Sequence, residues 1–86
     1  MTQTSRSILI TGCSTGIGYA AAVACRAAGW QVFASARQTD DVARLQAEGF
    51  SALLLDLNEP ASIHGALAQV LAQTGGTLDA LFNNGG

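Results

Sequence analysis

Short apolar stretches alternate along the chain with segments in which apolar residues recur every three or four positions. The apolar stretches are rich in β-branched and large aliphatic residues, and they predict buried strands at residues 7–11, 31–36, 51–57 and 78–84. The segments between them predict helices at residues 16–28, 39–48 and 58–73. Regular alternation of strands and helices calls for a parallel sheet with right-handed crossovers. The fold class is therefore α/β, and the chain supplies half or more of a doubly wound sheet.

Capping signals set the ends of the predicted helices. Gly29 and Gly49 stand just past the first and second helices, where glycine commonly ends a helix. We expect Thr39 or Asp40 to cap the second helix and Asn58 the third, because their side-chain oxygens accept hydrogen bonds from the first amides. The third strand is apolar without alternation, which is typical of a strand covered on both faces.

The composition indicates part of a larger domain. Eighty-six residues suffice for one small domain or for a portion of a bigger one. Hydrophobic residues make up 49% of the chain and charged residues only 12%, so there is more material for a core than for a surface. We therefore expect residues 1–86 to be an incomplete domain.

Charge and cysteine content narrow the partners and the compartment. The formal net charge is -2 and the arginines form no basic cluster, which argues against nucleic acid and anionic membranes as partners. No apolar run approaches the roughly 18 residues that span a bilayer. Cys13 and Cys25 are too few for a disulfide framework and lack the paired spacing of a metal site. We expect no metal ligands and a reducing, cytoplasmic environment.

The segment TGCSTGIG, residues 11–18, lies where the first strand passes into the first helix. Gly12 permits a tight turn, Gly16 lets a pyrophosphate approach the main chain, and Gly18 lets the helix lie close to the sheet. The first amides of the helix then face the phosphates from the positive end of its dipole. A triphosphatase loop would need a lysine, and the chain contains none. The segment therefore predicts a Rossmann-type dinucleotide site.

The end of the second strand decides which dinucleotide fits. In such folds an acid about 20 residues after the glycines binds the ribose hydroxyls of NAD, whereas an arginine there accommodates the 2′-phosphate of NADP. Ala36 and Arg37 occupy this place, so the acid is missing and a guanidinium stands beside the gap. Because a guanidinium holds phosphate through two hydrogen bonds, the sequence predicts NADP as the cofactor. A solvated arginine at the start of a loop is the alternative.

Cys13 stands inside the glycine turn, where the amides of the helix start could lower the pKa of a thiol. A thiol of that kind would suit a redox switch. We favour the alternative, a small side chain packed in the turn.

These motifs resemble those of the short-chain dehydrogenases/reductases. TGCSTGIG matches the TGxxxGxG cofactor motif of that family, and LDL at residues 55–57 matches the acid at the end of its third strand. FNNGG at residues 82–86 resembles the NNAG of its fourth strand, with Gly85 where the family has alanine. The three motifs follow in the family's order and cover nearly the whole chain.

The resemblance assigns roles to individual residues. It implies that Asp56 and the backbone of Leu57 contact the adenine, that Asn83 helps to hold the central sheet, and that the main chain after Asn83 borders the cofactor. Together with the glycine turn and the second strand, it gives a predicted cofactor-binding set of Thr11, Gly12, Ser14, Thr15, Gly16, Ile17, Gly18, Arg37, Asp56, Leu57, Asn83 and Gly85.

The resemblance also implies that the chemistry takes place elsewhere. The family uses a Tyr-x-x-x-Lys pair, a serine and a further asparagine, all on elements that follow the fourth strand. The only tyrosine here, Tyr19, lies in the first predicted helix, and there is no lysine. We expect no catalytic residue in this chain, a catalytic part beyond residue 86, and no activity from the 86 residues alone.

For the intact protein the resemblance implies an NADP-dependent oxidoreductase that moves a hydride between nicotinamide and a carbonyl or alcohol carbon. The residues ITGCSTGIG and VFASAR are similar to those of members that act on lipophilic alcohols and ketones. The resemblance also implies a homo-oligomer. Two alternatives stay open: a non-catalytic module that binds and senses NADPH, and a Rossmann-like methyltransferase. The methyltransferase is disfavoured by Ala36, because such sites usually have an acid at this position.

Overall fold

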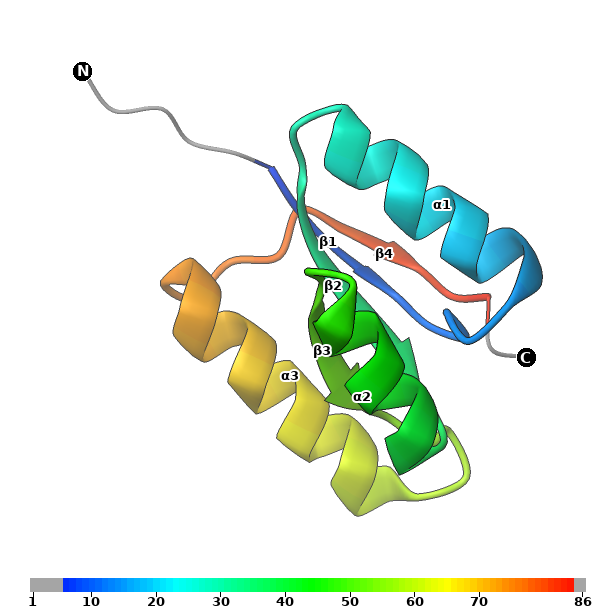
Figure 1. The fold of residues 1–86 in the computed structure, drawn as a ribbon. Coiled ribbons are helices and arrows are strands. Elements are labelled where there is room, and N and C mark those ends of the chain that lie inside the picture. Colours follow the sequence, from blue (N-terminus) through cyan, green and yellow to red (C-terminus); the bar gives the residue numbers. More distant parts are fainter. Residues whose placement is uncertain (1–5, 85–86) are drawn as a thin grey trace.

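The computed structural model describes residues 6–84, which form a parallel sheet with helices on both faces (Figure 1). The sheet has four strands in the order β3-β2-β1-β4. The elements are β1 (Ser7–Ile10), α1 (Gly16–Ala27), β2 (Gln31–Ala36), α2 (Thr39–Ala47), β3 (Ser51–Leu54), α3 (Pro60–Thr74) and β4 (Ala80–Phe82). The structure confirms the predicted α/β class and the parallel, doubly wound arrangement.

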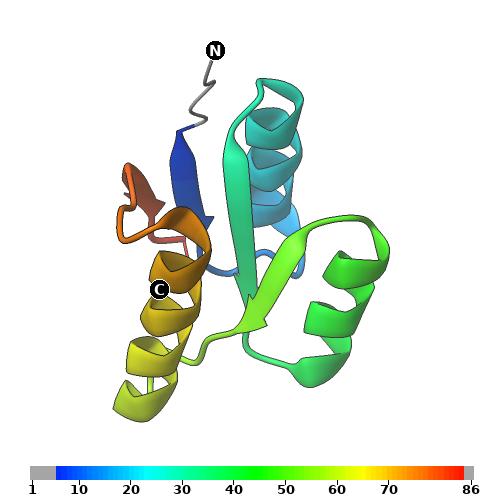
Figure 2. The same ribbon diagram turned by 90° about the vertical axis from the view of Figure 1, so that its left-hand side faces the viewer.

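Helices α1 and α2 cover one face of the sheet, and α3 covers the other (Figure 2). The chain steps from β1 through β2 to β3 in one direction and then crosses back past β1 to β4. Because parallel crossovers are right-handed, a reversal of direction puts the next helix on the opposite face. The reversal lies between β1 and β4, which is where doubly wound sheets bind their ligands.

The two central strands carry the core. Leu9, Ile10 and Phe33 are at most 1% exposed. Successive residues of a strand face opposite layers, so Ile10 packs in the cluster under α1 and α2 while Leu9 and Phe33 pack with Val70 of α3. Both faces of β1 and β2 are thus filled, and the ends of the strands are left to form a site.

Glycines end the first two helices as the sequence predicts, but α2 starts differently. Gly29 and Gly49 have positive φ values of 95° and 96° just past α1 and α2. The predicted cap of α2 is wrong, because Thr39 and Asp40 lie inside the helix and Gln38 occupies the N-cap position without a side-chain hydrogen bond. Asp40 still lies in the first turn, where a carboxylate suits the helix dipole.

Asn58 does not cap α3. The helix begins at Pro60, and Glu59 is its N-cap residue. Asn58 belongs to the preceding turn, in which its backbone N–H donates to Asp56 Oδ1 at 2.9 Å. The backbone N–H of Asp56 in turn donates to Ser62 Oγ at 2.8 Å. Asn58 therefore takes part in the turn after β3, and α3 starts without a side-chain cap.

The third and fourth strands are shorter than predicted. β3 ends at Leu54, which is 45% exposed because β3 lies at an edge of the sheet. The expectation that this strand is covered on both faces is therefore wrong. The chain beyond it remains attached to β2, since the Leu55 N–H donates to the Ala36 carbonyl at 2.9 Å. This bond brings residues 55–57 to the end of β2.

β4 forms the opposite edge in the part of the chain that the structure describes, and it pairs with β1 alone. Leu81 is 60% exposed and Phe82 is 37% exposed. An edge strand with exposed apolar side chains and unpaired backbone groups is a template for association with another chain.

We predict that the 86-residue chain produced alone self-associates through β4. Leu81→Lys should raise the soluble, monomeric fraction, because a charged side chain on an edge strand opposes pairing. Light scattering coupled to size-exclusion chromatography measures this fraction. Leu71→Lys is the control, since Leu71 is also exposed but lies on α3. A wild-type chain that stays monomeric at high concentration would contradict the prediction.

Candidate cofactor-binding site

A cleft of about 280 Å³ opens at the carboxyl ends of the strands. Its walls come from the turn after β1, the loop after β2, the segment after β3 and Asn84 after β4. The lining residues are Thr11, Gly12, Ser14, Arg37, Leu55, Leu57 and Asn84. The cleft thus lies at the point where the strand order reverses.

The glycines of the β1–α1 turn adopt the backbone that each needs. Gly12 and Gly16 both have φ near 68°, a conformation that side chains disfavour. Around Gly16 there is open space, since a Cβ built there would meet no atom within 4 Å. A Cβ at Gly18 would collide with the carbonyl of Gly12 and the side-chain amide of Asn84. The third glycine therefore allows α1 to start directly against the turn.

Hydrogen bonds tie this turn to β4. The Thr11 N–H donates to the Phe82 carbonyl at 3.0 Å. The Thr11 hydroxyl donates to Asn83 Oδ1 at 3.1 Å and accepts from the Asn84 N–H at 2.9 Å. The Asn84 side-chain amide donates to the Gly12 carbonyl at 3.3 Å. Thr11 and the two asparagines thus fix the turn against the end of the neighbouring strand.

Asn84 is a site residue that the sequence interpretation missed. It lines the cleft and contacts Gly12, whereas Asn83 contacts Thr11 and does not line the cleft. The available signal was a second amide side chain directly after the fourth strand. The resemblance to a known motif drew the assignment to its neighbour.

Arg37 follows β2 directly and lines the cleft with an exposed side chain. Ala36 before it is 2% exposed and brings no carboxylate to the end of β2. Ser14, which belongs to the glycine turn, lines the same cleft. The structure therefore brings the predicted phosphate-binding arginine and the glycine turn together.

The segment after β3 meets the cleft through Leu55 and Leu57, on either side of Asp56. One carboxylate oxygen of Asp56, Oδ1, accepts the Asn58 N–H and so stabilises the local turn. Leu57 is 38% exposed, which is high for a large apolar side chain beside a cleft. The structure thus places an apolar wall at this end, with Asp56 between its two leucines.

The remaining predicted residues lie outside the cleft lining. Thr15 is the N-cap residue of α1 and makes no side-chain capping bond, and Ile17 is 71% exposed on the first turn. Thr15 and Gly16 line a second hollow between the start of α1 and α2. Gly85 lies outside the residues that the structure describes.

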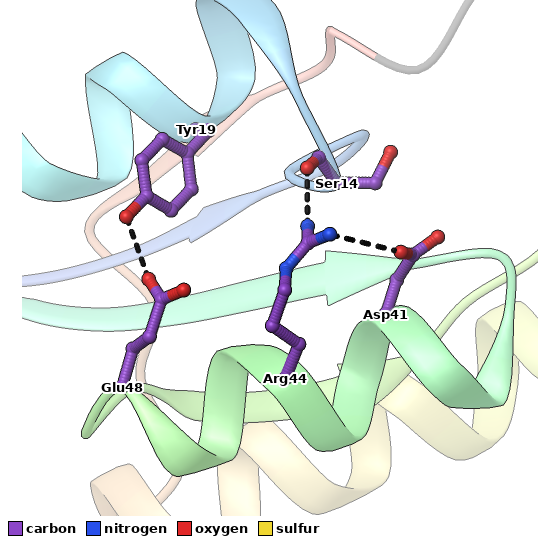
Figure 3. A network of polar contacts seen from close by, with 5 residues as sticks. All are labelled: Ser14, Tyr19, Asp41, Arg44 and Glu48. Atoms are coloured by element: carbon purple, nitrogen blue, oxygen red, sulfur yellow. Dashed lines mark hydrogen bonds and ion pairs between the residues drawn. The ribbon is translucent and has the colours of Figure 1, made fainter.

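On the side of the turn that faces α2, polar contacts join α2 to the turn and to α1 (Figure 3). Arg44 Nη2 donates to the Ser14 carbonyl, and Arg44 Nη1 lies 3.4 Å from Asp41 Oδ1. The Tyr19 hydroxyl donates to Glu48 Oε1 at 2.6 Å. That hydrogen bond raises the pKa of Tyr19, so the phenol stays protonated at neutral pH and even less phenolate is present to act as a base.

Cys13 is packed inside the turn and has no exposed surface. Its thiol donates to the Ile10 carbonyl at 3.1 Å, and its backbone N–H donates to the Ser35 carbonyl at 2.9 Å. Burial raises the pKa of the thiol to about 11. The suggestion that helix amides lower this pKa is therefore wrong, because removal from water outweighs the backbone contact.

Residues 6–84 contain neither a metal-binding cluster nor a membrane-spanning helix. No cluster of three or more histidine, cysteine or acidic side chains is placed to hold a metal ion. Within the same residues, no helix combines the length and the apolar character needed to cross a membrane.

A parallel sheet that reverses direction beside a glycine turn defines a dinucleotide-binding α/β domain. The family model described as short chain dehydrogenase matches residues 6–86. The chain belongs to this family, whose members are oxidoreductases that bind nicotinamide cofactors. The match confirms the resemblance that its three motifs indicate.

Relatives span the same segment. The chain is 43% identical over 81 residues to the uncharacterized oxidoreductase YbbO of Escherichia coli K12, covering 94% of this chain and 30% of that protein. It is 38% identical over 85 residues to the NADPH-dependent 1-acyldihydroxyacetone phosphate reductase of Schizosaccharomyces pombe, covering 98% and 29%. The structure of actinorhodin polyketide ketoreductase with NADPH matches with a TM-score of 0.81 and 30% identity, covering 95% and 33%. The chain thus spans about a third of its relatives' length.

We predict that Gly18→Ala lowers the free energy of unfolding by about 1–3 kcal/mol and weakens cofactor binding, because the added methyl forces the turn away from α1. Gly65→Ala is the matched control. Gly65 also lies in a helix, but open space surrounds its Cβ position, so this change should stabilise by roughly 0.5–1 kcal/mol. Urea denaturation compares the variants, and equal effects would refute the close contact.

We predict that Cys13 makes stability fall at high pH. The folded thiol ionises near pH 11 and the unfolded thiol near 9.0, so its contribution is complete below pH 9 and is lost as pH rises to about 11. The full loss is about 3 kcal/mol. Urea denaturation across this range, in a Cys25→Ala background, should show the stability difference between Cys13 and Cys13→Ala shrinking. A constant difference would show that Cys13 is not desolvated.

Proposed function

We propose that the protein is an NADP-dependent oxidoreductase that transfers a hydride between nicotinamide and a carbonyl or alcohol carbon of a small, lipophilic molecule. The observation that carries the proposal is the cleft in which Arg37 follows Ala36 opposite the glycine turn. Membership of the short-chain dehydrogenase family supports the reaction class. The position of the arginine supports the choice of cofactor.

The residues present fit a dinucleotide. Gly16 has no atom within 4 Å of its Cβ position, so a pyrophosphate can reach the main chain there. The first turn of α1 contains no acidic residue, which leaves the positive end of the helix dipole free to attract an anion. When bound, the cofactor supplies the hydride, while this chain's residues bind and orient it.

Arg37 would hold the 2′-phosphate. Its guanidinium can form two parallel hydrogen bonds with a phosphate, and Ala36 offers no carboxylate to hold the ribose hydroxyls of NAD instead. Two relatives support this assignment by their names, the NADPH-dependent reductase of Schizosaccharomyces pombe and the ketoreductase structure with NADPH. NADP is therefore the proposed cofactor.

The other cofactor contacts follow the cleft and the family motifs. Thr11, Gly12 and Ser14 border the phosphates, and Thr15, Gly16, Ile17 and Gly18 belong to the same turn and helix start. Leu57 and Asp56 form the adenine end, where the exposed leucine offers an apolar wall. Asn83 acts through Thr11, and Gly85, which lies outside the described residues, belongs to the set through its place in the family motif. We add Asn84 to this set, because its amide holds the Gly12 carbonyl.

The proton of the reaction would be handled outside this chain. Residues 1–86 would be the cofactor-binding portion of an oligomeric, cytoplasmic enzyme, and a Tyr-x-x-x-Lys pair would lie in the remaining part. A non-catalytic NADPH-binding module would have the same cleft without that pair, so the full coding sequence separates the two. The relatives' names, an oxidoreductase and a reductase, favour the enzyme.

We predict that Arg37→Asp in the full-length protein lowers NADPH affinity at least about tenfold, since a charged hydrogen bond is lost and a like charge is added. NADH affinity should rise, because a carboxylate there can accept from the ribose hydroxyls. Calorimetric titration with NADPH, NADH and S-adenosylmethionine gives the three affinities.

Arg6→Asp is the control for this charge change. Arg6 lies at the amino end of β1, opposite the cleft, where its guanidinium is 5.9 Å from the Trp30 ring centroid. It should leave the ratio of NADPH to NADH affinity unchanged. Equal ratios in wild type and Arg37→Asp would remove Arg37 as the phosphate ligand, and binding of S-adenosylmethionine alone would overturn the proposed function.

A further inference from the structure

Arg44 reaches from α2 to the glycine turn (Figure 3). One of its terminal nitrogens donates to the Ser14 carbonyl, and the other lies 3.4 Å from Asp41 Oδ1. The side chain of Arg44 is 45% exposed and that of Asp41 is 28% exposed. Two partners on one planar guanidinium fix its orientation more firmly than a single hydrogen bond would.

The contact of Arg44 continues a series of anchors along the turn. The Gly12 carbonyl accepts from Asn84, and the Cys13 N–H donates to the Ser35 carbonyl, so these two residues are held by the sheet. Ser14 follows, and its carbonyl is held by α2. At Thr15, the N-cap residue of α1, no side-chain hydrogen bond closes the helix start. Arg44 therefore anchors the residue just before this helix start, as a donor to its carbonyl, and leaves the first amides of α1 without a side-chain cap.

The bond to Ser14 also sets the direction of the next amide. In a trans peptide the carbonyl and the following N–H point in opposite directions, and the described chain contains no cis peptide. By drawing the Ser14 carbonyl towards α2, Arg44 directs the Thr15 N–H away from α2. It also fixes the peptide plane that precedes Thr15, the N-cap residue after which α1 begins at Gly16. The Thr15 N–H is one of the amides that an anion at the start of α1 would meet.

We propose that Arg44 is a positioning residue of the cofactor site, holding the Ser14–Thr15 peptide so that the amides at the start of α1 are set for a pyrophosphate. The inference rests on the proposed function. Because the pyrophosphate is common to NADP and NAD, Arg44 supports the binding of both. Arg37, which faces the extra phosphate, distinguishes between them.

A direct role for Arg44 in holding the 2′-phosphate is less consistent with the contacts. Its charge is paired with Asp41, and its guanidinium is already engaged by the Ser14 carbonyl. Arg44 lines the hollow that also contains Tyr19 and Glu48, whereas Arg37 lines the cleft. The two arginines therefore lie on different sides of the glycine turn.

The test compares Arg44→Met and Arg44→Lys in the full-length protein by titration with NADPH and with NADH. Arg44→Met should weaken both about tenfold, as expected for the loss of a charge-assisted hydrogen bond, with the ratio of the two affinities unchanged. In steady-state assays KM for the cofactor should rise while kcat stays near the wild-type value. Arg44→Lys retains a charged donor and should recover most of the affinity.

Two further variants separate positioning from general stability. Arg26→Met removes an arginine that also ties α1 to the end of α2, through the Glu48 carbonyl at 2.8 Å, but does not touch the glycine turn. It should lower the melting temperature and leave both affinities unchanged. Asp41→Asn keeps Arg44 and removes its charged partner, and it should lower the affinity for both cofactors by the same small factor.

Several outcomes would overturn the inference. If Arg44→Met lowers the affinity for NADPH alone, Arg44 is a ligand of the 2′-phosphate. If Arg44→Met leaves both affinities unchanged, Arg44 has no role in cofactor binding. If Arg26→Met lowers both affinities equally, the effect of Arg44→Met is one of general stability. In each case the proposed function survives, because wild type still binds NADPH. A wild-type protein that binds neither nicotinamide cofactor would overturn both.

Discussion

The close approach of α1 to the turn after β1 is the constraint on which the site depends. A dinucleotide can use the amides at the start of a helix only if the helix begins directly behind the phosphates. Gly18 makes this possible, because any Cβ there would occupy the space of the Gly12 carbonyl and the Asn84 amide. Asn84, two residues past the end of β4, takes part in the same contact. The end of β4 and the start of α1 therefore meet at this turn.

The arginines show how little of the positive charge is left for a ligand. The chain has four arginines and no lysine. Arg6 lies over the Trp30 ring, and Arg26 lies 3.9 Å from the centroid of Phe50. Arg44 is paired with Asp41 and bound to the glycine turn. Arg37 is the arginine that lines the cleft, so the choice of cofactor falls to this residue on the proposed function.

Local patterns predicted the order of the elements and the glycines that end the first two helices correctly, because each depends on a few neighbouring residues. Gly29 and Gly49 end their helices with positive φ whatever packs around them. The predicted capping residues were wrong because each helix starts at another place: Gln38 and Glu59 occupy the N-cap positions, and Asn58 lies in the turn that Asp56 stabilises. The exposure of Leu54 was missed because it depends on which strand becomes an edge.

Contacts between distant segments were beyond sequence reasoning for a different reason. Arg44 lies on the exposed side of a short amphipathic helix, where its spacing from Asp41 indicates an ordinary ion pair. Only the packing of α2 beside α1 brings its guanidinium to Ser14. Asn84 likewise gains its role from the pairing of β1 with β4.

On the proposed function, the division of the fold explains why this chain bears on the choice of cofactor rather than on the choice of substrate. The cleft is built by the loops after β1, β2 and β3, with a single contribution from beyond β4. These loops face the adenosine and pyrophosphate portion of a dinucleotide in folds of this kind, and the 2′-phosphate belongs to that portion. On the proposed function, the nicotinamide and the reacting carbon would lie farther across the reversal between β1 and β4. A change at Arg37 or Arg44 would therefore alter which cofactor binds, or how tightly, without altering which carbonyl or alcohol reacts.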